Sequence, residues 1–483
     1  MYNNSLKSVH IVGIGGCAAS GIAELLVSNG VKVTGSEQKS VSGLDYLERI
    51  GVKITYEHSK NNLLQNGQKP DLLLYSPAVI SLNPNNPEII GAKELGIKSE
   101  SWQNFIGDYL NTIGKTGITV SGSEGKGTTA GVLTMILKGT EYDPLSILGA
   151  KIKDIIPNGS SNIYFGNGST YILEGDEYNR NFHNYHPAYN VMINFSYEHP
   201  ETYRNFDEYK DGFYNFFKGM TQPATLILRA IPNCIDLVNR YKLDKSHKII
   251  WICEDSSDLY RLTGERWLIS DQITTVNGSS FSLNFNGEKY DFTIGVLPSF
   301  MIINSAAAVV TAFKLGLDYK TIFHNLKKFK GMVRRYDLYE TKGNGRIITD
   351  YGHSPDALNC IYEETKAVFG DMPIHYIFHP HLYSRTKNFF EEFISVLSKP
   401  DRVSVLDVYP AREDAAVWEP IVNSRMLVDR LNAVRDNVFY AGKPENIAEV
   451  MKEMINPDEI TVFIGAGNMD HYYEPLIKEF GGC

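Results

Sequence analysis

The chain has 483 residues, and its 47 Lys and Arg against 56 Asp and Glu give a formal charge of −9. A chain of this length predicts about three domains. The acidic balance and the lack of a basic tract argue against a nucleic-acid partner, because duplex binding rests on clustered Lys and Arg. With 43% apolar and 21% charged residues, the composition is that of a globular chain, which excludes wholesale disorder and collagen-like repeats.

The cysteines and the first residues predict the compartment. The five cysteines are scattered and include no Cys-x-x-Cys pair, which argues against a disulfide framework and a thiolate zinc site. No basic segment followed by an apolar run opens the chain, so we expect no secretory signal. No stretch is long and apolar enough to cross a bilayer. We therefore expect a cytoplasmic protein with no membrane partner.

The first segment alternates between predicted strands and helices. A buried strand over residues 9–12 leads through a glycine-rich turn to a helix over 18–28, which ends at Gly30. Further strands are predicted over 31–34 and 71–75. This alternation predicts a parallel sheet covered by helices.

The second segment begins with a predicted strand over residues 118–120. A loop over 121–129 follows, and an apolar stretch over 131–138 continues it as a helix. Strands predicted over 170–173 and 190–194 precede loops that carry acidic residues or histidine.

The third segment follows Gly331 and contains four apolar strands separated by helical stretches. These strands are predicted over residues 347–350, 374–378, 403–408 and 461–464. The whole pattern predicts an α/β fold of three domains: a Rossmann-like domain, a central P-loop-type domain and a second Rossmann-like domain. Their predicted bounds are 1–112, 113–331 and 332–483.

A glycine fingerprint of the form G-x-G-x-x-A joins the first strand to the first helix. Its glycines let the backbone approach a pyrophosphate, and the helix N-terminus supplies free N–H groups. Glu37, at the end of the second strand, is placed for a ribose hydroxyl or a base edge. The pattern fits a nicotinamide dinucleotide, a UDP-sugar or a tight turn without a ligand. The candidate residues of the turn are Gly13, Ile14, Gly15 and Gly16.

A second phosphate-type loop lies between a strand and a helix of the central segment. Lys126 can neutralise the terminal phosphates of a nucleotide, and the hydroxyl of Thr128 or Thr129 can reach Mg²⁺. The spacing G-x-x-G-K is shorter than the standard Walker loop, and Gly127 stands where Ser or Thr usually follows the lysine. The candidate ATP-binding residues are Gly122, Ser123, Glu124, Gly125, Lys126, Gly127, Thr128 and Thr129.

Two phosphate-type loops in different segments separate two enzyme classes. A dehydrogenase needs one nucleotide, whereas a ligase that joins a nucleotide-borne substrate with the help of ATP needs two. The sequence therefore favours a ligase over an oxidoreductase.

The order of these motifs resembles the Mur ligase family, the ATP-dependent amide ligases of peptidoglycan precursor synthesis. The likeness covers nearly the whole chain. It implies that the first domain binds a UDP-sugar and that the central domain is the ATPase, with ATP and Mg²⁺ as cofactors. Besides the glycine turn, it implies UDP-sugar contacts for Ser36, Glu37, His58, Ser76 and Ala78.

The resemblance also implies catalytic roles beyond Lys126. Glu174 opens a Glu-Gly-Asp-Glu motif whose first carboxylate binds magnesium in the family, and His199 matches a histidine that assists the second metal. Thr128, Glu174 and His199 are thus the expected metal-binding residues. Arg335, in the hinge motif at the start of the third domain, is expected to contact ATP, and Asp350 its ribose.

Motifs of the third domain are similar to those of family members that add L-alanine. They imply that the incoming amine binds near His353, Arg385 and Arg412. The expected substrates are UDP-N-acetylmuramate and a small amino acid or peptide, and the expected state is a monomer or a homodimer.

Two departures from the family pattern keep alternatives open. Phe300 and Met301 precede the expected ATP contact Asn304 where the family has a His-Asn pair against adenine, so a catalytically weakened UDP-sugar-binding paralogue is one alternative. Residues 99–102 lack the arginine of the L-alanine ligases and look more like the ligase that recycles the tripeptide L-Ala-γ-D-Glu-diaminopimelate. The leading expectation is addition of L-alanine to UDP-N-acetylmuramate through an acyl phosphate.

Overall fold

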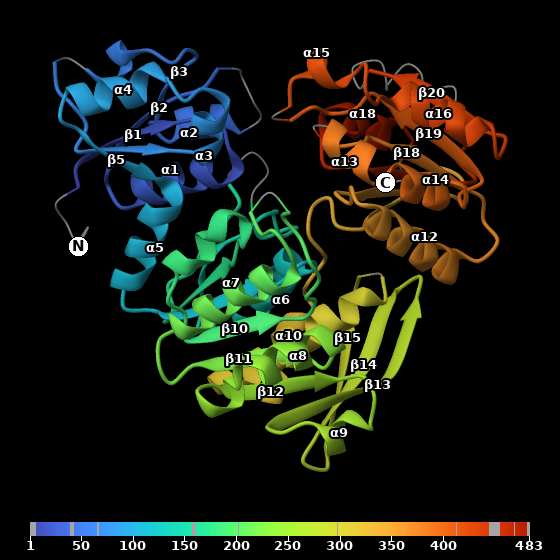
Figure 1. Cartoon of the computed structure of the whole chain (residues 1–483). Helices are drawn as coiled ribbons and strands as arrows, with labels where there is room; N and C mark the ends of the chain where they lie inside the picture. Colours follow the sequence, from blue (N-terminus) through green and yellow to red (C-terminus); the bar gives the residue numbers. More distant parts are fainter. Residues whose placement is uncertain are drawn as a thin grey trace. The chain divides into compact units, whose positions relative to one another are not determined.

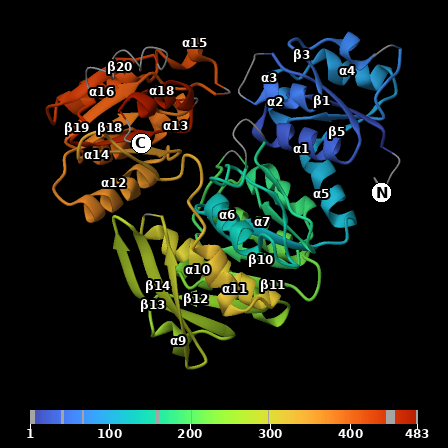
Figure 2. The same ribbon diagram turned by 180° about the vertical axis from the view of Figure 1, so that it is seen from behind.

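The computed structural model describes residues 6–480 except 39–42, 65–66, 157–160, 201, 297, 412, 444–454 and 468. The chain forms two compact units, shown in Figures 1 and 2. The first unit holds residues 1–331 without the segments 274–278 and 297–299, which group with residues 332–483 in the second unit. Among the described residues, no helix has the length and apolar character needed to span a membrane.

The N-terminal sheet is parallel and has the strand order β3-β2-β1-β4-β5. Strand β1 pairs with β2 on one side and with β4 on the other, so that Val12 lies opposite both Ser36 and Tyr75. The chain order changes direction at β1, and such a switch point is where α/β sheets bind ligands. The elements are β1 (Ser8–Val12), α1 (Cys17–Ser28), β2 (Lys32–Ser36), α2 (Leu44–Arg49), β3 (Lys53–Thr55), η1 (Lys60–Leu63), β4 (Leu72–Tyr75), α3 (Pro77–Leu82), α4 (Pro87–Glu94), β5 (Lys98–Ser101) and α5 (Trp102–Thr112).

The central sheet has the order β15-β14-β13-β12-β11-β10-β6-β9-β7-β8 in the described residues. Helices α7 and α8 cover one face in Figure 1, and α10 and α11 cover the other in Figure 2. The elements are β6 (Thr116–Ser121), α6 (Lys126–Leu137), β7 (Leu145–Ile147), β8 (Ile163–Phe165), β9 (Thr170–Glu174), η2 (Tyr178–Asn184), β10 (Tyr189–Met192), α7 (Phe206–Lys218), β11 (Thr225–Arg229), α8 (Pro232–Tyr241), η3 (Leu243–Lys245), β12 (Lys248–Cys253), α9 (Asp258–Arg261), β13 (Glu265–Thr275), β14 (Gly278–Phe285), β15 (Glu288–Ile294), α10 (Phe300–Leu315) and α11 (Tyr319–Leu326).

Two predicted boundaries of the central segment were wrong. The predicted loop over 121–129 is shorter, because Gly125 adopts a left-handed conformation (φ 83°) and α6 begins at Lys126. Gly127 and Thr128 therefore lie in the first turn of the helix. The strand predicted to end at residue 194 ends at Met192.

The sheet of the second unit has the order β16-β17-β21-β18-β19-β20. Strand β16 is antiparallel to β17, and the other pairs are parallel, so Asp350 and Phe378 both lie opposite Ile464 at one edge. The strand predicted over 403–408 ends earlier, at Leu406. The elements are β16 (Asp337–Glu340), β17 (Arg346–Asp350), α12 (Pro355–Phe369), β18 (Ile374–Phe378), α13 (Tyr383–Asn388), α14 (Phe390–Leu397), β19 (Arg402–Leu406), α15 (Ala415–Trp418), α16 (Ser424–Asn432), β20 (Val438–Gly442), β21 (Ile460–Ile464) and α18 (Asp470–Phe480).

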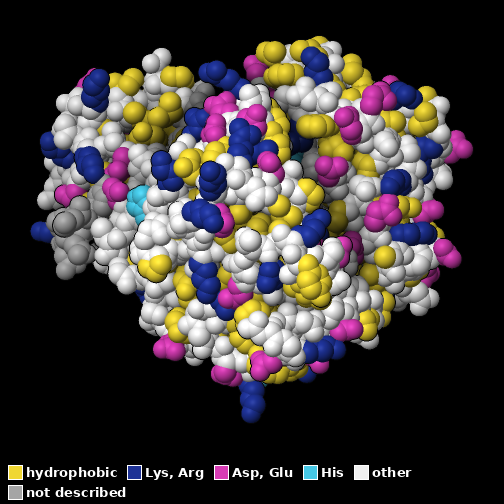
Figure 3. Space-filling model, turned by 60° about the horizontal axis from the view of Figure 1, so that its bottom comes forward, with side chains coloured by type: hydrophobic (Ala, Val, Ile, Leu, Met, Phe, Trp, Pro, Cys, Tyr) yellow, Lys and Arg dark blue, Asp and Glu magenta, His cyan; other side chains and the backbone are white. Residues whose placement is uncertain are grey.

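The predicted fold class, an α/β chain built on mostly parallel sheets, is confirmed. Parallel strands buried on both faces form continuous apolar runs, and this pattern located β1, β6 and β18. The equally buried parallel strands β11 and β12 were not predicted. On the face shown in Figure 3, basic and acidic side chains are interspersed, and the described residues form no continuous basic patch there.

Candidate active site

The loop between β6 and α6 has the backbone shape of a phosphate-binding turn. Gly122 (φ 105°) and Gly125 (φ 83°) occupy conformations that L side chains rarely adopt. Gly125 also has no space for a side chain, because an added Cβ would lie 2.7 Å from Asn304 Oδ1. The first N–H groups of α6 have no acceptor within the helix and point towards the loop, as anion binding at a helix N-terminus requires.

Lys126 is the first residue of α6, and its ammonium folds back over the loop. Its Nζ donates to Gly122 O (2.6 Å), to Ser123 O (3.0 Å) and to the carboxylate of Glu177 (3.0 and 3.2 Å). Burial alone lowers the pKa of Lys126, but the charges of Glu177, Glu198 and nearby carboxylates outweigh it and raise that pKa. The lysine is therefore a fixed positive charge beside the phosphate-binding turn.

Glu177 is the acid that faces Lys126, and the sequence had not singled it out. Its side chain is fully buried. Burial raises the pKa of Glu177, but Lys126 and His199 reverse this effect and hold its pKa below the ordinary value. Glu177 closes the Glu-Gly-Asp-Glu motif that Glu174 opens, but its contact with Lys126 follows only from the fold.

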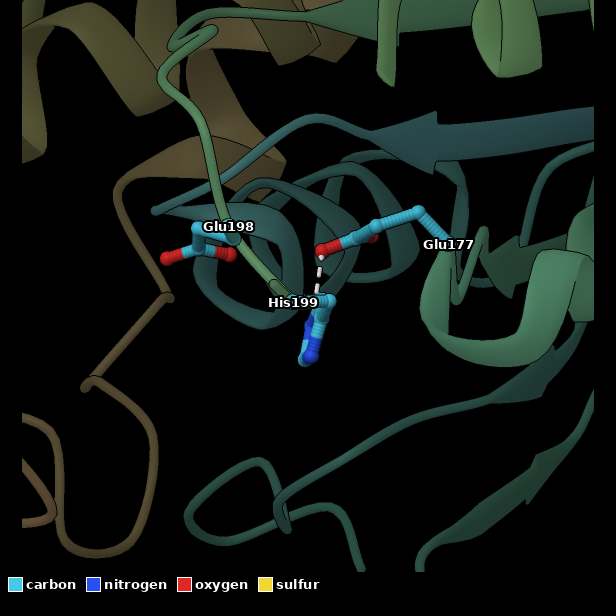
Figure 4. A group of neighbouring side chains, drawn as sticks. All are labelled: Glu177, Glu198 and His199. Carbon is cyan, nitrogen blue, oxygen red and sulfur yellow. Dashed lines mark ion pairs between the residues drawn. The ribbon is translucent and has the colours of Figure 1, made fainter. Parts of the chain in front are cut away.

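Glu177, Glu198 and His199 form a group whose ligand atoms all lie within 4.8 Å of one another. Figure 4 shows these side chains converging from the segments after β9 and β10. His199 Nε2 lies 3.4 Å from Glu177 Oε1. Burial raises the pKa of Glu198, and the charge of Glu177 adds to this effect. His199 adopts a left-handed backbone conformation (φ 57°), which is strained for a non-glycine residue.

Glu174, the predicted metal ligand, ends β9 beside the first turn of α6. Its carboxylate accepts a hydrogen bond from the N–H of Gly149. A Cβ on Gly127 would lie 2.9 Å from Glu174 Oε1. The unusual glycine after Lys126 is thus explained by the close approach of this carboxylate.

The structure distinguishes the two candidate threonines. The Thr129 hydroxyl is fully buried and donates to Asn304 Oδ1 (2.9 Å). Asn304 Nδ2 in turn donates to Phe300 O (2.7 Å), so this amide supports the loop from beneath. The Thr129 hydroxyl is thus engaged within the protein, and the metal contact of Thr128 stays a prediction. Met301 is buried, and the effect of Phe300 and Met301 on adenine binding stays a prediction.

The glycine turn of the first domain follows β1 as predicted. Position 13 requires glycine for two reasons: its φ is 75°, and an added Cβ would lie 2.7 Å from Val79 Cγ2. The N–H of Gly15 donates to Glu37 Oε2 (3.0 Å), so this acid lies across the turn. Glu37 is thus close to where a pyrophosphate would bind, and its predicted contact with a ribose stays a prediction.

The other predicted UDP-sugar residues lie at the carboxyl edge of the same sheet. Ser36 ends β2, and its hydroxyl lies 3.0 Å from His58 Nδ1. Both side chains contact the buried carboxylate of Glu88, which the sequence had not singled out. Ser76 precedes α3, and Ala78 lies in its first turn.

The hinge-side residues of the second unit surround the end of β17. Asp350 is buried and accepts hydrogen bonds from the N–H groups of Tyr336 (2.7 Å) and Gly352 (2.6 Å). Burial raises the pKa of Asp350, against the lowering effect of Arg335. The Arg335 guanidinium lies over the Tyr351 ring, 5.2 Å from its centroid. Asp350 therefore shapes this backbone turn, and its contact with a ribose stays a prediction.

The predicted amine-binding residues His353 and Arg385 lie near each other. His353 and His381 have ring centroids 5.5 Å apart, and Arg385 Nη1 lies 3.0 Å from His381 Nδ1. Burial and the charge of Arg385 lower the pKa of His353 to about 3, so its imidazole is neutral. Arg412 lies outside the described residues.

Three family models cover most of the chain in this order. The model described as Mur ligase family, catalytic domain, matches residues 8–113; the Mur ligase middle domain matches 120–312; and the Mur ligase, glutamate ligase domain, matches 334–467.

Individual proteins support the same assignment. A curated UDP-N-acetylmuramate–L-alanine ligase from Chlorobaculum tepidum is 30% identical over 471 residues, which cover 96% of this chain and 94% of the relative. The solved structure of UDP-N-acetylmuramate-alanine ligase from Thermotoga maritima matches with a TM-score of 0.79 at 24% identity, covering 98% and 99% of the two chains. A murein peptide ligase from Psychrobacter arcticus has the same fold, with a TM-score of 0.70 at 17% identity and 99% coverage of both chains.

The fold and the phosphate-binding site together define an ATP-dependent amide ligase. The chain belongs to the Mur ligase family, and its middle domain binds ATP.

Proposed function

We propose that the protein joins an amino acid, with L-alanine as the first candidate, to the carboxylate of UDP-N-acetylmuramate in cytoplasmic peptidoglycan precursor synthesis. The observation that carries the proposal is the Lys126 ammonium, which lies over the phosphate-binding turn beside acidic groups suited to a cation. The full-length similarity to the Chlorobaculum tepidum ligase supports this substrate pair.

Magnesium fits the donor set at this site. Glu177 and Glu198 offer hard carboxylate oxygens and His199 a nitrogen, while Thr128 and Glu174 lie in or beside the first turn of α6. The pKa of Lys126 is raised by the charges of three carboxylates, those of Glu174, Glu177 and Glu198. The site therefore carries more negative than positive charge. A bound Mg²⁺ would balance this excess and neutralise phosphate charge.

The reaction needs little covalent help from the protein. The substrate carboxylate attacks the γ-phosphorus of ATP, the bond to ADP breaks, and an acyl phosphate forms. The amine then attacks the acyl carbon, releases phosphate and loses a proton. Lys126 stabilises charge on the transferred phosphoryl group, and Arg335 is our proposed second cation for ATP. The predicted amine site at His353 and Arg385 would hold the incoming carboxylate and amine.

Mass spectrometry of the reaction product tests the proposal. The purified protein is incubated with ATP, Mg²⁺ and UDP-N-acetylmuramate, with L-alanine or the tripeptide L-Ala-γ-D-Glu-diaminopimelate in separate reactions. We expect a product that is heavier than the sugar nucleotide by one alanine residue. A product with the tripeptide alone would overturn the choice of amine, and UDP-sugar binding without any product would favour the weakened paralogue.

A further inference from the structure

A buried carboxylate lies beneath the predicted UDP-sugar edge of the first domain. Glu88 is in the first turn of α4, and its side chain is fully buried. An isolated buried carboxylate is strongly unfavourable, so its retention requires several well-placed donors. The donors around Glu88 come from three other segments of the same domain.

Each Glu88 oxygen has two partners. Oε1 lies 2.7 Å from Asn62 Nδ2 and 3.2 Å from His10 Nε2. Oε2 lies 2.6 Å from the Ser36 hydroxyl and 3.0 Å from His58 Nδ1. These contacts, with His10 first among them, outweigh burial and hold the pKa of Glu88 below its usual value. Glu88 is therefore ionised at neutral pH and can only accept hydrogen bonds.

The ionised Glu88 carboxylate determines the positions of the Ser36 hydroxyl proton and of the His58 ring proton. The Ser36 hydroxyl donates its proton to Glu88. His58 Nδ1 lies 3.0 Å from the same hydroxyl oxygen, so one lone pair faces this nitrogen and the other is left for a ligand that donates. His58 carries a proton on Nδ1 for the same reason, so its Nε2 is the nitrogen left for a ligand. The far side of the carboxylate is held by His10, whose Nδ1 lies 2.7 Å from Thr34 Oγ1.

The same serine also holds the glycine turn. The carbonyl oxygen of Ser36 accepts from the N–H of Gly13 (2.9 Å) and of Ile14 (3.2 Å). Ser36 thus connects Glu88 to the start of the glycine fingerprint through one residue. Through Ser36, Glu88 therefore influences both the backbone of the glycine turn and the choice of donor and acceptor atoms at the predicted nucleotide edge.

We propose that Glu88 is a positioning residue for the UDP-sugar, which fixes Ser36 as a hydrogen-bond acceptor and His58 in its Nδ1-protonated form. The ligand group that Ser36 meets is then a donor, such as a ribose hydroxyl or a base N–H. This inference rests on the proposed function, because it concerns the same UDP-sugar site. Pre-organised polar groups bind better than groups that must reorient, and Glu88 supplies that order before the ligand arrives.

Calorimetric titration with UDP tests the role of Glu88 in the full-length protein. Glu88→Gln replaces one acceptor oxygen with an NH₂ group that faces other hydrogen-bond donors. We expect UDP to bind on the order of tenfold more weakly to this variant. The matched control is Glu94→Gln, which removes an exposed carboxylate of the same helix that pairs with Lys60. Unchanged ATP affinity and a cooperative thermal transition confirm that each variant is folded.

A double-mutant cycle separates positioning from general support. In a Ser36→Ala/His58→Gln background, adding Glu88→Gln should cost no further UDP affinity, because the groups that it positions are already gone. An undiminished further loss would contradict the proposal, and so would equal UDP affinity for Glu88→Gln and the wild type.

Nitrogen-15 NMR of the histidines keeps the proposal testable if Glu88→Gln fails to fold. With the His58 signal assigned by its loss in His58→Gln, we expect protonation at Nδ1 in the wild type. A signal from the form protonated only at Nε2 would overturn the inference. If the wild type shows Nδ1 protonation but binds no UDP, the proposed function fails instead.

Discussion

The buried acid at the predicted UDP-sugar edge and the acids around Lys126 differ in how their charge is balanced. Glu88, in the first domain, accepts from four neutral or cationic side chains, and each of its oxygens has two partners. Around Lys126, the carboxylates of Glu174, Glu177 and Glu198 share one ammonium and His199.

The difference shows how the same residue type does two jobs. An acid whose hydrogen bonds are complete fixes its neighbours and needs no ion. Acids that outnumber their cations gain from a metal, because a divalent charge relieves their mutual repulsion. We therefore expect substitutions at Glu88 to change nucleotide affinity and substitutions around Lys126 to change turnover and metal requirement.

The largest effect is expected for Lys126→Ala. It removes the ammonium that donates to two carbonyls of the phosphate-binding turn and leaves the Glu177 carboxylate without that partner. We predict a fall of about 10²- to 10³-fold in kcat for phosphate release, measured with a coupled phosphate assay. UDP affinity should stay unchanged, since Glu88 and its partners are untouched. Retention of more than half of the wild-type rate would contradict the role of this lysine.

Glu177→Gln should act through the metal. It keeps the shape of the side chain but removes one negative charge from the group with Glu198 and His199. We predict that the Mg²⁺ concentration for half-maximal activity rises by about tenfold, measured by titrating Mg²⁺ at saturating ATP. Glu208→Gln, at a half-exposed acid paired with Arg180, is the matched control and should leave this concentration unchanged. An unshifted Mg²⁺ curve for Glu177→Gln would remove this acid from the metal site.

Gly127→Ala separates activity from stability. Alanine is the better helix former, but its Cβ would lie 2.9 Å from Glu174 Oε1, and the end of that side chain must move. We predict a several-fold lower kcat with an unchanged or slightly higher melting temperature, because a small displacement of a catalytic group lowers the rate. A variant with the wild-type rate would show that the position of Glu174 does not matter.

The smallest effects are expected for the two threonines, which form a matched pair. Thr129→Val removes the buried hydrogen bond to Asn304 and should lower the free energy of unfolding by about 1 kcal/mol, measured by urea denaturation. Thr128→Val should leave that free energy unchanged and raise the Mg²⁺ requirement. If the two variants exchange these effects, Thr129 is the metal-facing residue.

Local patterns predicted the parts of this molecule that depend on neighbours in the chain. The strands before both glycine loops and the helix after Lys126 came from apolar runs and glycine spacing, and the structure confirms them. The helix start was misplaced because a left-handed Gly125 can open a helix as well as interrupt one.

The acids that complete the two sites could not be predicted in the same way. Glu88 lies 52 residues from Ser36, and Glu177 lies 51 residues from Lys126. No local spacing connects such pairs, and a single Asp or Glu is usually a solvated surface residue. The resemblance to the family named Glu174 and His199, but the direct partner of Lys126 emerged only from the folded geometry.

The most direct test of the ligase assignment is phosphate release from ATP, with each substrate omitted in turn. We predict release only when Mg²⁺, UDP-N-acetylmuramate and one amine are all present, with L-alanine the most effective of L-alanine, glycine, L-serine and the tripeptide. Release at the same rate without the sugar nucleotide, or no release with any amine, would contradict the account.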